Sequence, residues 1–431
     1  MDMERVWKPV RVAVAVMMIL AGQTAAQTQT QAADTTGTTI QLDARIDSLA
    51  VQLRQAQEAI EQQRALIDVL IQTQSQPAPS PPQGMPAVGR LVAPQQASNL
   101  LNPNISLIGD IRAQAGRDFA PDTRAFTLHE AEIGIQAPID PFARADAFIA
   151  MSPEEGVDLE EMYITFQTLP LGLQAKIGKF RSNFGKFNRT HVPETPFSDR
   201  PLVTETYFGE EGLAGVGASL SLFIPNPWVY LNLDAEFTAT PEEVPAFAIF
   251  DSTAGEFLTG GRRRDLLYLT RLGTFLDLSE STNLTLGATY ATGVHDPAGA
   301  LRTHIEGIDL TLRWQPLRRA IYTSIEWQTE VLFSQREQAG GGRVNSSGLF
   351  SYIDWQILRR WHIGARYDFT QFPDTSVADE QGVLGFLTFT PSEFSMITVQ
   401  GRGVRRTDGS WHGVGMLRIT FNIGPHGAHP F

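Results

Sequence analysis

From residue 105 onward, apolar and polar residues alternate with a period of two, and this pattern limits the possible fold more than any other feature of the sequence. A period of two is that of a β-strand whose two faces meet different surroundings. The chain is therefore expected to be an all-β protein. We predict sixteen strands, at 105–116, 124–137, 142–151, 156–168, 171–180, 212–223, 227–238, 265–277, 282–292, 303–315, 320–335, 346–358, 361–371, 380–390, 393–403 and 411–424.

The gaps between these strands are sorted by length. Every second gap is a short turn, such as Leu169-Pro170 or Pro391-Ser392, whereas the intervening gaps, such as 181–211 and 239–264, are mostly longer. Short turns at one end and long loops at the other are typical of a bacterial outer-membrane barrel. A β-propeller or a sandwich gives no reason for this sorting. We predict a 16-stranded antiparallel transmembrane β-barrel over residues 105–431.

The two faces of the predicted strands agree with a barrel. In strand 361–371, Trp361 and Ile363 alternate with His362 and Arg366. An apolar face toward lipid and a polar face toward a wet lumen give this pattern. A sheet packed on a dry core would show the same alternation of apolar and polar residues, so periodicity alone does not distinguish the two. The sorting of the loops by length and the signal-like amino-terminal segment favour the barrel. Acidic residues outnumber basic ones on the predicted lumen wall, whose charged members include Arg112, Glu130, Glu132, Arg144, Asp146, Lys176, Arg366 and Arg418.

The amino terminus has the pattern of an exported protein. In residues 1–26, Lys8 and Arg11 precede the short apolar run 12–22, and Ala25-Ala26 offers a cleavage point, which predicts a secretory signal peptide. No later stretch reaches the roughly 20 continuous apolar residues of a membrane helix. The sequence has no Cys, so disulfides and thiolate metal sites are excluded. A formal net charge of −13 argues against nucleic acid as a partner.

A different periodicity lies between the signal peptide and the barrel. Residues 40–72 carry apolar residues in alternating steps of three and four, which predicts a short coiled-coil helix. A single amphipathic helix lying on its own barrel is the alternative. Residues 75–104 are rich in Pro and Gln and are expected to form a semi-rigid linker. An even number of strands places both ends of the barrel on the same side of the membrane. With a periplasmic amino terminus, both chain ends lie in the periplasm, and we therefore place the coiled coil there. The heptad a positions are Ile46, Leu53, Ile60 and Ile67.

The gap 181–211 is unusual because it mixes aromatic and basic residues. Loops of this length inside a compact domain are usually functional or disordered, and aromatic residues need a surface to pack against. We predict that this loop folds back into the channel and narrows it. The alternative is that its basic residues pair with acids of the same loop, and the turn-like segment 198–201 favours a structural role for Arg200. The predicted pore-constriction residues are Lys179, Arg181, Lys186, Arg189, His191 and Arg200.

The motif GKFRSNFGKFNRTH at 178–191, the segments 199–203 and 104–110, and the last strand resemble the phosphate-selective porin (porin O/P) superfamily, in particular its members with a periplasmic coiled coil. The resemblance covers about residues 100–431. It implies a sixteen-stranded barrel, commonly trimeric, whose third loop constricts the pore. Phosphate selectivity in that family depends on a strongly positive lumen. The mixed wall predicted here departs from this pattern, so the resemblance does not carry phosphate specificity to this chain.

These observations predict an outer-membrane porin. Small hydrophilic solutes or ions would diffuse passively through a homotrimer embedded in outer-membrane lipid, and loop 181–211 would set selectivity. Two alternatives stay open. In one, the chain is a structural tether whose coiled coil reaches toward peptidoglycan. In the other, weaker one, it is a barrel-borne hydrolase.

Catalytic and metal motifs are not evident in the sequence. It contains neither a GxSxG nucleophile elbow nor an HExxH pattern, so we predict no catalytic residues, no cofactor and no metal site. The pairs Glu130 and Glu132, and Glu160 and Glu161, could suggest acid/base chemistry or a cation site. Charged side chains are ordinary on a lumen wall, however, and this simpler explanation is favoured.

Overall fold

The structure of the protein is a computed structural model that describes residues 103–116, 125–153, 156–241, 244–251, 256–258, 265–298 and 300–424. The predicted signal peptide (1–26), the coiled-coil helix (40–72) and nearly all of the linker (75–104) lie outside the described residues. No helix in the part of the chain that the structure describes is long and apolar enough to cross a membrane.

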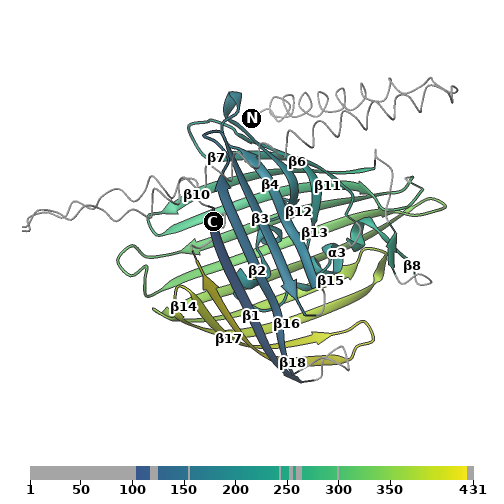
Figure 1. The fold of residues 1–431 in the computed structure, drawn as a ribbon. Helices are drawn as coiled ribbons and strands as arrows, with labels where there is room; N and C mark the ends of the chain where they lie inside the picture. Colours follow the sequence, from purple (N-terminus) through teal and green to yellow (C-terminus); the bar gives the residue numbers. More distant parts are fainter. Residues whose placement is uncertain are drawn as a thin grey trace, which may run out of the picture. The chain divides into compact units, whose positions relative to one another are not determined.

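Sixteen antiparallel strands form one closed barrel. Figure 1 shows the arrangement of the strands from one side. Each strand pairs with its neighbours in chain order, β7 pairs with β10, and β1 pairs with β18 to close the ring. The predicted 16-stranded antiparallel barrel is therefore confirmed. The strands are β1 Asn104–Gly116, β2 Phe126–Pro138, β3 Ala143–Ser152, β4 Gly156–Phe166, β5 Leu173–Arg181, β6 Ala214–Phe223, β7 Tyr230–Ala239, β10 Leu266–Ser279, β11 Thr282–Val294, β12 Arg302–Trp314, β13 Ser324–Glu337, β14 Arg343–Leu358, β15 Trp361–Phe372, β16 Thr375–Ser392, β17 Ser395–Arg405 and β18 Trp411–Ile423.

Some element boundaries differ from the sequence prediction. The strand predicted at 320–335 begins only at Ser324, because residues 316–323 form consecutive turns after Pro316. The gap predicted at 372–379 is mostly strand, because β16 begins at Thr375. The predicted gap 239–264 contains a separate hairpin of β8 (Ile249–Asp251) and β9 (Glu256–Leu258). Strand positions are thus better predicted than the loops between them.

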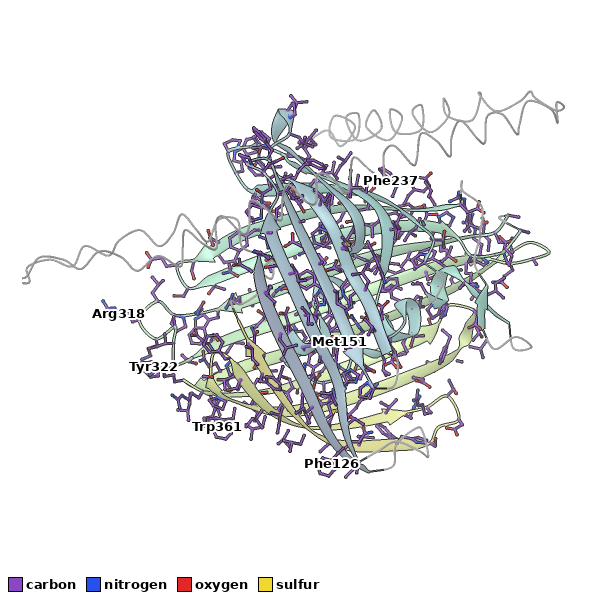
Figure 2. All side chains as sticks on the ribbon, viewed as in Figure 1. Phe126, Met151, Phe237, Arg318, Tyr322 and Trp361 are labelled. Atoms are coloured by element: carbon purple, nitrogen blue, oxygen red, sulfur yellow. The ribbon has the colours of Figure 1, made fainter. Side chains whose placement is uncertain are left out.

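The outer face of the barrel is apolar and carries aromatic side chains near both ends. At the end with the short turns, Phe142, Trp228 and Tyr322 are more than half exposed. Figure 2 shows Tyr322 and Trp361 at this end, together with Arg318 of the β12–β13 turn. Phe126 and Trp411 are exposed at the end with the longer loops. Aromatic residues at both borders of an apolar band are typical of transmembrane barrels.

A β-bulge in β4 changes which side chains face inward. Phe148 of β3 pairs with Glu161 and Ile149 pairs with Leu159, so Glu160 is the extra residue. The outward positions shift across it, since Leu159 and then Met162 are exposed apolar residues. A bulge re-aims the side chains beside it. Both Glu160 and Glu161 are consequently buried.

The long connection between β5 and β6, residues 182–213, lies inside the barrel and is called the inner loop below. It contains η2 (Phe187–Arg189), η3 (Val192–Glu194) and α3 (Leu202–Phe208). Figure 1 shows α3 within the ring of strands, and it contacts β14, β15 and β16. The short helix η4 (Pro245–Phe247) contacts α3 and β12. Aromatic residues of the loop and apolar wall residues form one buried cluster.

Candidate functional site

The two ends of the inner loop are tied together by hydrogen bonds. The Ser182 N–H donates to the Leu213 carbonyl at 2.8 Å. The Asn188 side chain donates to the carbonyls of Ser182 and Leu213 and accepts from the Leu213 N–H, all at 2.8 Å. Gly212 has φ +78°, and a Cβ there would lie 2.6 Å from the Asn188 Oδ1 atom. The loop therefore leaves and rejoins the wall at a closed neck.

The aromatic residues of the inner loop pack on one arc of the wall. Phe197 is fully buried, and its ring stacks on Phe187 with 5.8 Å between centroids. Edge contacts with Tyr352 and Phe386 place its centroid 5.4 and 6.2 Å from theirs. The Tyr207 hydroxyl donates to the Ser346 hydroxyl at 2.7 Å. Burial of each such ring contributes about 1.5–3 kcal/mol, so this packing is a main source of loop stability.

Arg418 of β18 holds the middle of the inner loop. Its Nη1 atom donates to the carbonyls of Thr195 and Phe197, both at 3.0 Å. Its Nη2 atom donates to the Val192 carbonyl at 2.6 Å, and its Nε atom lies 3.2 Å from the Asp110 carboxylate. A planar guanidinium presents several donors in fixed directions. Arg418 can therefore satisfy three carbonyls of a buried loop that has no strand partner of its own.

A second arginine, Arg366 of β15, binds the turn that follows η3. Its Nη2 atom donates to the Asp199 carboxylate at 2.7 Å, and its Nε atom donates to Asp368 at 2.8 Å. The guanidinium also lies 4.2 Å from the centroid of the Phe197 ring. Arg402 lies 3.0 Å from the same Asp199 carboxylate. Burial alone would raise the pKa of Asp199, but Arg366 and Arg402 hold it below its ordinary value.

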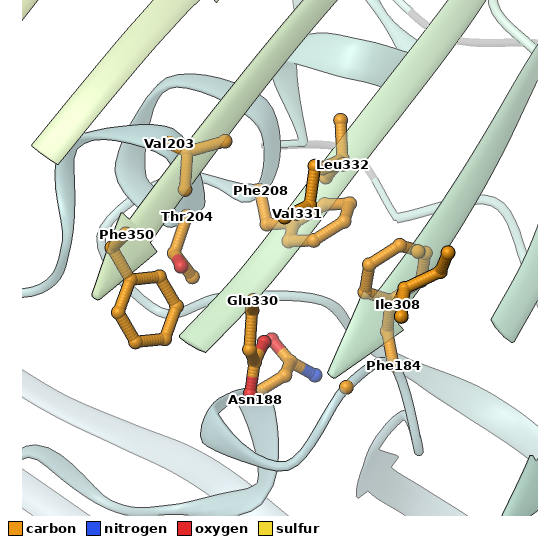
Figure 3. Close-up of a pocket in the computed structure, with 12 residues that line it drawn as sticks. Phe184, Asn188, Val203, Thr204, Phe208, Ile308, Glu330, Val331, Leu332 and Phe350 are labelled. Atoms are coloured by element: carbon orange, nitrogen blue, oxygen red, sulfur yellow. The ribbon is translucent and has the colours of Figure 1, made fainter. Parts of the chain in front are cut away.

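Glu330 of β13 accepts from the backbone at the start of η2. Its Oε1 atom accepts from the N–H groups of Lys186 at 2.8 Å and Phe187 at 2.7 Å. Gly185 has φ +61°, and a Cβ there would lie 2.2 Å from Glu330 Oε2, so only glycine fits. Figure 3 shows Glu330 and Phe208 in the lining of a cavity of about 20 Å³ between loop and wall. That volume holds about one water molecule, so this cavity is too small to be a solute site.

The opposite side of the inner loop meets a buried cluster of acids. His191 Nδ1 lies 3.0 Å from Glu132 and 2.6 Å from Glu160, and Nε2 lies 3.1 Å from Glu161. The Phe148 ring packs at 5.0 Å from the imidazole centroid. Burial alone would lower the pKa of His191, but Glu132 and its acidic neighbours raise it well above the ordinary value. Glu132, Glu160 and His191 each offer a metal-ligand atom, and these atoms lie within 4.8 Å of one another.

Two arginines flank this acid cluster. Arg181 Nη2 donates to Glu160 at 2.8 Å and to Glu211 at 3.1 Å, and the Arg181 N–H donates to Glu161 at 2.5 Å. Arg200 donates to the carbonyls of Glu210 and Glu211. Burial lowers the pKa of Arg200 to about 9, and the neighbouring Arg181 adds to this effect. Both arginines are thus engaged in holding the loop neck.

The six predicted pore-constriction residues occupy three environments. Arg181, His191 and Arg200 are buried in the contacts just described. Lys179 pairs in the strand ladder with Met162 and Val216, which are exposed on the outer face. Paired residues of adjacent strands share a face, so Lys179 points away from the lumen, where it lies 3.5 Å from Asp158.

Lys186 and Arg189 remain partly accessible. Lys186 is about one-third exposed and lies 4.0 Å from Glu326 of β13. Arg189 is half-buried, and its Nε atom has no hydrogen-bond partner among the described residues. Burial and the nearby Arg271 lower the pKa of Arg189. Of the six, these two residues are the ones whose charges solutes inside the barrel can meet.

The predicted lumen-wall residues lie on the inner face and are mostly paired. Arg112 binds Asp110 at 2.8 Å, and Arg144 binds Asp146 at 2.7 Å. Lys176 lies over the Tyr163 ring at 4.2 Å. Of these predicted wall residues, Glu132, Arg366 and Arg418 contact the inner loop, and Glu130 lies beside Glu132 on the same face.

Three residues that hold the inner loop, Glu160, Asp199 and Glu330, are not among the site residues predicted from the sequence, although Glu160 was considered with Glu161 as a possible acid/base or cation site. For Glu160 a signal was present, because the exposed apolar positions change from odd (Leu159) to even (Met162) numbers across the bulge. No signal in the sequence indicated that Asp199 or Glu330 would hold the loop. Their partners are Arg366 and the backbone of Lys186, more than 140 residues away in the chain.

Comparisons with known proteins agree with a porin-like barrel. No protein-family model matches the chain. In structure it is similar to an anion-selective porin from Comamonas acidovorans, with 11% sequence identity, 75% of this chain and 99% of that chain covered, and a TM-score of 0.51. It is also similar to OprB of Pseudomonas putida, with 10% identity, 76% and 95% covered, and a TM-score of 0.52. The outer-membrane channel DcaP of Acinetobacter baumannii gives 11% identity, 75% and 96% covered, and a TM-score of 0.50.

These likenesses show the fold, and a sequence relative shows the family. An uncharacterized protein of Aquifex aeolicus (strain VF5) is 30% identical over 345 residues, which cover 72% of this chain and 71% of the relative. The chain belongs to the same protein family as this Aquifex aeolicus protein.

Proposed function

We propose that the protein is an outer-membrane porin through which small hydrophilic solutes or ions diffuse passively. The observation that carries this proposal is the inner loop, which is folded against the inner wall of a closed sixteen-stranded barrel. Barrels of this size leave an aqueous channel that a loop can narrow. The apolar outer face with aromatic residues near both ends supports a place in outer-membrane lipid.

The accessible charges inside the barrel support weak ion selectivity. Lys186 faces Glu326, and Arg144 faces Asp146. His362 lies 3.1 Å from Asp354. Selectivity filters for anions use rings of unbalanced positive charge, whereas here positive and negative side chains are paired. We propose that the chain shares the barrel and constricting loop of the phosphate-selective porins without their preference for phosphate.

Planar-bilayer recording tests the porin function directly. Purified wild-type protein should give stepwise conductance with a cation-to-anion permeability ratio close to one. Replacing residues 190–208 of the inner loop by a short Gly/Ser linker should raise the conductance of each step, because the loop occupies part of the lumen. Absence of conductance from correctly folded wild type would overturn the porin proposal.

The segments outside the described residues complete the proposal. We propose that residues 1–26 are a signal peptide, and that residues 40–72 form a periplasmic coiled coil joined by the linker 75–104 to a homotrimeric barrel. A helix of this length is marginal in water unless it has partners. Deleting residues 40–72 should weaken the trimer, as measured by native mass, and should leave barrel insertion intact. A deletion variant that keeps full trimer stability would show that the coiled coil does not support the trimer.

A further inference from the structure

The acid cluster beside His191 has the composition of a metal site. Glu130 and Glu132 come from β2, Glu160 and Glu161 come from β4, and His191 comes from the inner loop. All five side chains are at least nine-tenths buried. Three elements that are distant in sequence thus converge on one point of the inner wall, and the β4 bulge is what brings two adjacent glutamates to it.

The charges in this cluster do not balance. Among the described residues, the buried carboxylates of Glu132, Glu160 and Glu161 form ion pairs with two cationic groups only, Arg181 and His191. Even with a protonated imidazole, negative charge remains in excess. Excess buried charge is costly unless a counter-charge or a hydrogen bond offsets it. A cation at the centre of the cluster would supply that counter-charge.

An unpartnered buried oxygen atom lies beside the cluster, where a ligand could reach it. Glu130 is nine-tenths buried, and its Oε1 atom has no hydrogen-bond partner among the described residues. Glu130 lies two residues before Glu132 on the same inner face of β2, which places it beside the cluster. Glu132 is 1% exposed, and its Oε2 atom lies 3.0 Å from His191 Nδ1. Buried polar atoms in proteins are rarely left without a partner, as Glu130 Oε1 is.

Arg181 orients the two glutamates of β4. Its Nη2 atom donates to Glu160 Oε1, and its backbone N–H donates to Glu161 Oε1. The Oε2 atoms of both glutamates are thereby turned toward the imidazole. Partners that fix the direction of ligand atoms are a regular part of protein metal sites.

We propose that Glu132, Glu160 and His191 bind one divalent transition-metal ion, with Zn²⁺ as the model ion, and that Glu130 supplies a further oxygen. An imidazole combined with carboxylates suits Zn²⁺ better than Ca²⁺, which takes oxygen ligands. Bonds of about 2.0–2.2 Å require the ligand atoms to lie roughly 3.3 Å apart. The present 2.6 and 3.0 Å separations around Nδ1 therefore widen slightly on binding. The ion joins β2, β4 and the inner loop, and this role does not depend on the porin function. Sequence alone favoured no metal site, because the ligands follow no local motif.

The test uses tag-free full-length protein. After equilibrium dialysis against Zn²⁺, mass-spectrometric metal analysis should find one equivalent per wild-type chain, and the variant Glu132→Gln should lose it. The matched control is His362→Gln, because His362 also faces the lumen but has a single carboxylate partner, Asp354. Absence of Zn²⁺ from wild type, or equal loss in the control, would overturn the proposal.

X-ray absorption spectroscopy of Zn²⁺-loaded wild type keeps the proposal testable if Glu132→Gln fails to fold. One imidazole nitrogen with carboxylate oxygens in the first coordination shell would support the site. A shell without imidazole, or with two or more imidazoles, would place the ion elsewhere and refute it. Competition by Ca²⁺ at equal concentration should leave the Zn²⁺ bound, and displacement of Zn²⁺ would contradict the assigned ligand set.

Discussion

The inner loop contacts two arcs of the barrel wall. Apolar packing dominates on one arc, and ion pairs and hydrogen bonds dominate on the other. On the arc from β12 to β16, the wall residues that touch the loop are mostly apolar, although Glu330 and Arg366 also lie there. We call this the apolar arc, and its apolar members include Ile305, Leu332, Phe350, Tyr352 and Phe386. On the arc from β18 through β1 to β5, the wall offers ionised groups, which we call the charged arc; its members include Asp110, Glu132, Glu160, Glu161 and Arg418.

The two arcs contribute differently to loop docking: the apolar arc supplies most of the free energy, and the charged arc determines where the loop lies. Apolar contact is not directional and grows with buried area, so the apolar arc supplies most of the favourable free energy. Buried ion pairs contribute little net stability, because desolvation offsets their attraction, but breaking one of them is strongly destabilising. The charged arc therefore fixes where the loop lies. Arg418 illustrates this, because its three acceptor carbonyls are spaced along one segment of the loop.

The substitution Arg418→Met should have the largest effect on loop docking. Three loop carbonyls would lose a charged donor, and each such hydrogen bond contributes about 1.5–3 kcal/mol. We expect trypsin to cleave the folded barrel within the inner loop, for example after Arg189, and the open-channel conductance to increase. Arg313→Met is the matched control, because Arg313 is an exposed arginine on β12. Equal protease resistance of the two variants would mean that the charged arc does not position the loop.

The substitution Phe197→Ala tests the apolar arc and should cost about 3–5 kcal/mol of docking free energy. The ring is fully buried between loop and wall, so its removal leaves a cavity. Because Arg418 still binds the backbone, we expect partial loosening, seen as faster proteolysis without a large conductance change. Phe333→Ala on the outer face, where the ring is 48% exposed, is the control. A conductance change as large as that of Arg418→Met would show that both arcs position the loop.

Acidification should release the contact between Asp199 and the two arginines Arg366 and Arg402. The pKa of Asp199 is lower in the folded protein than its ordinary value near 3.9, so the ionised carboxylate stabilises the docked loop. This contribution is fully present above about pH 4 and is lost as the pH falls through the lowered pKa of Asp199. The charged groups that face Asp199 are Arg366, Arg402, Asp368 and Glu205.

Proteolysis by pepsin between pH 4 and pH 2 would report this release as faster cleavage within the inner loop. The variant Asp199→Asn should be cleaved more readily at pH 4 and should show less change on further acidification. An unchanged pH profile in the variant would assign the acid response to other carboxylates, such as those of the charged arc.

How far the sequence predicts this structure depends on the range of the interactions. Period-two alternation is a local pattern, and it predicted all sixteen barrel strands. The lengths of the gaps predicted which end of the barrel carries the short turns, such as the one at Leu169-Pro170. The helix α3 was not predicted, because seven residues are too few for a clear helical period and the helix depends on its contacts with β14 to β16. The composition of loop 181–211 indicated a folded loop, but the contact of Asp199 with Arg366 spans 167 residues and leaves no trace in one sequence.

The smallest expected effect concerns the charges that neither arc neutralises fully. The Lys186 ammonium lies as far as 4.0 Å from the Glu326 carboxylate, so this ion pair is loose. Arg189 Nε has no hydrogen-bond partner among the described residues. In a narrow passage of low effective dielectric, each such charge acts more strongly on a passing ion than it would in bulk water. The double variant Lys186→Gln, Arg189→Gln should therefore move the reversal potential in a salt gradient toward cation preference, with conductance nearly unchanged. Lys179→Gln is the control, because it removes one positive charge from the outer face of β5. If the control shifts the reversal potential as much as the double variant does, surface charge at the barrel mouth rather than the inner loop determines ion preference.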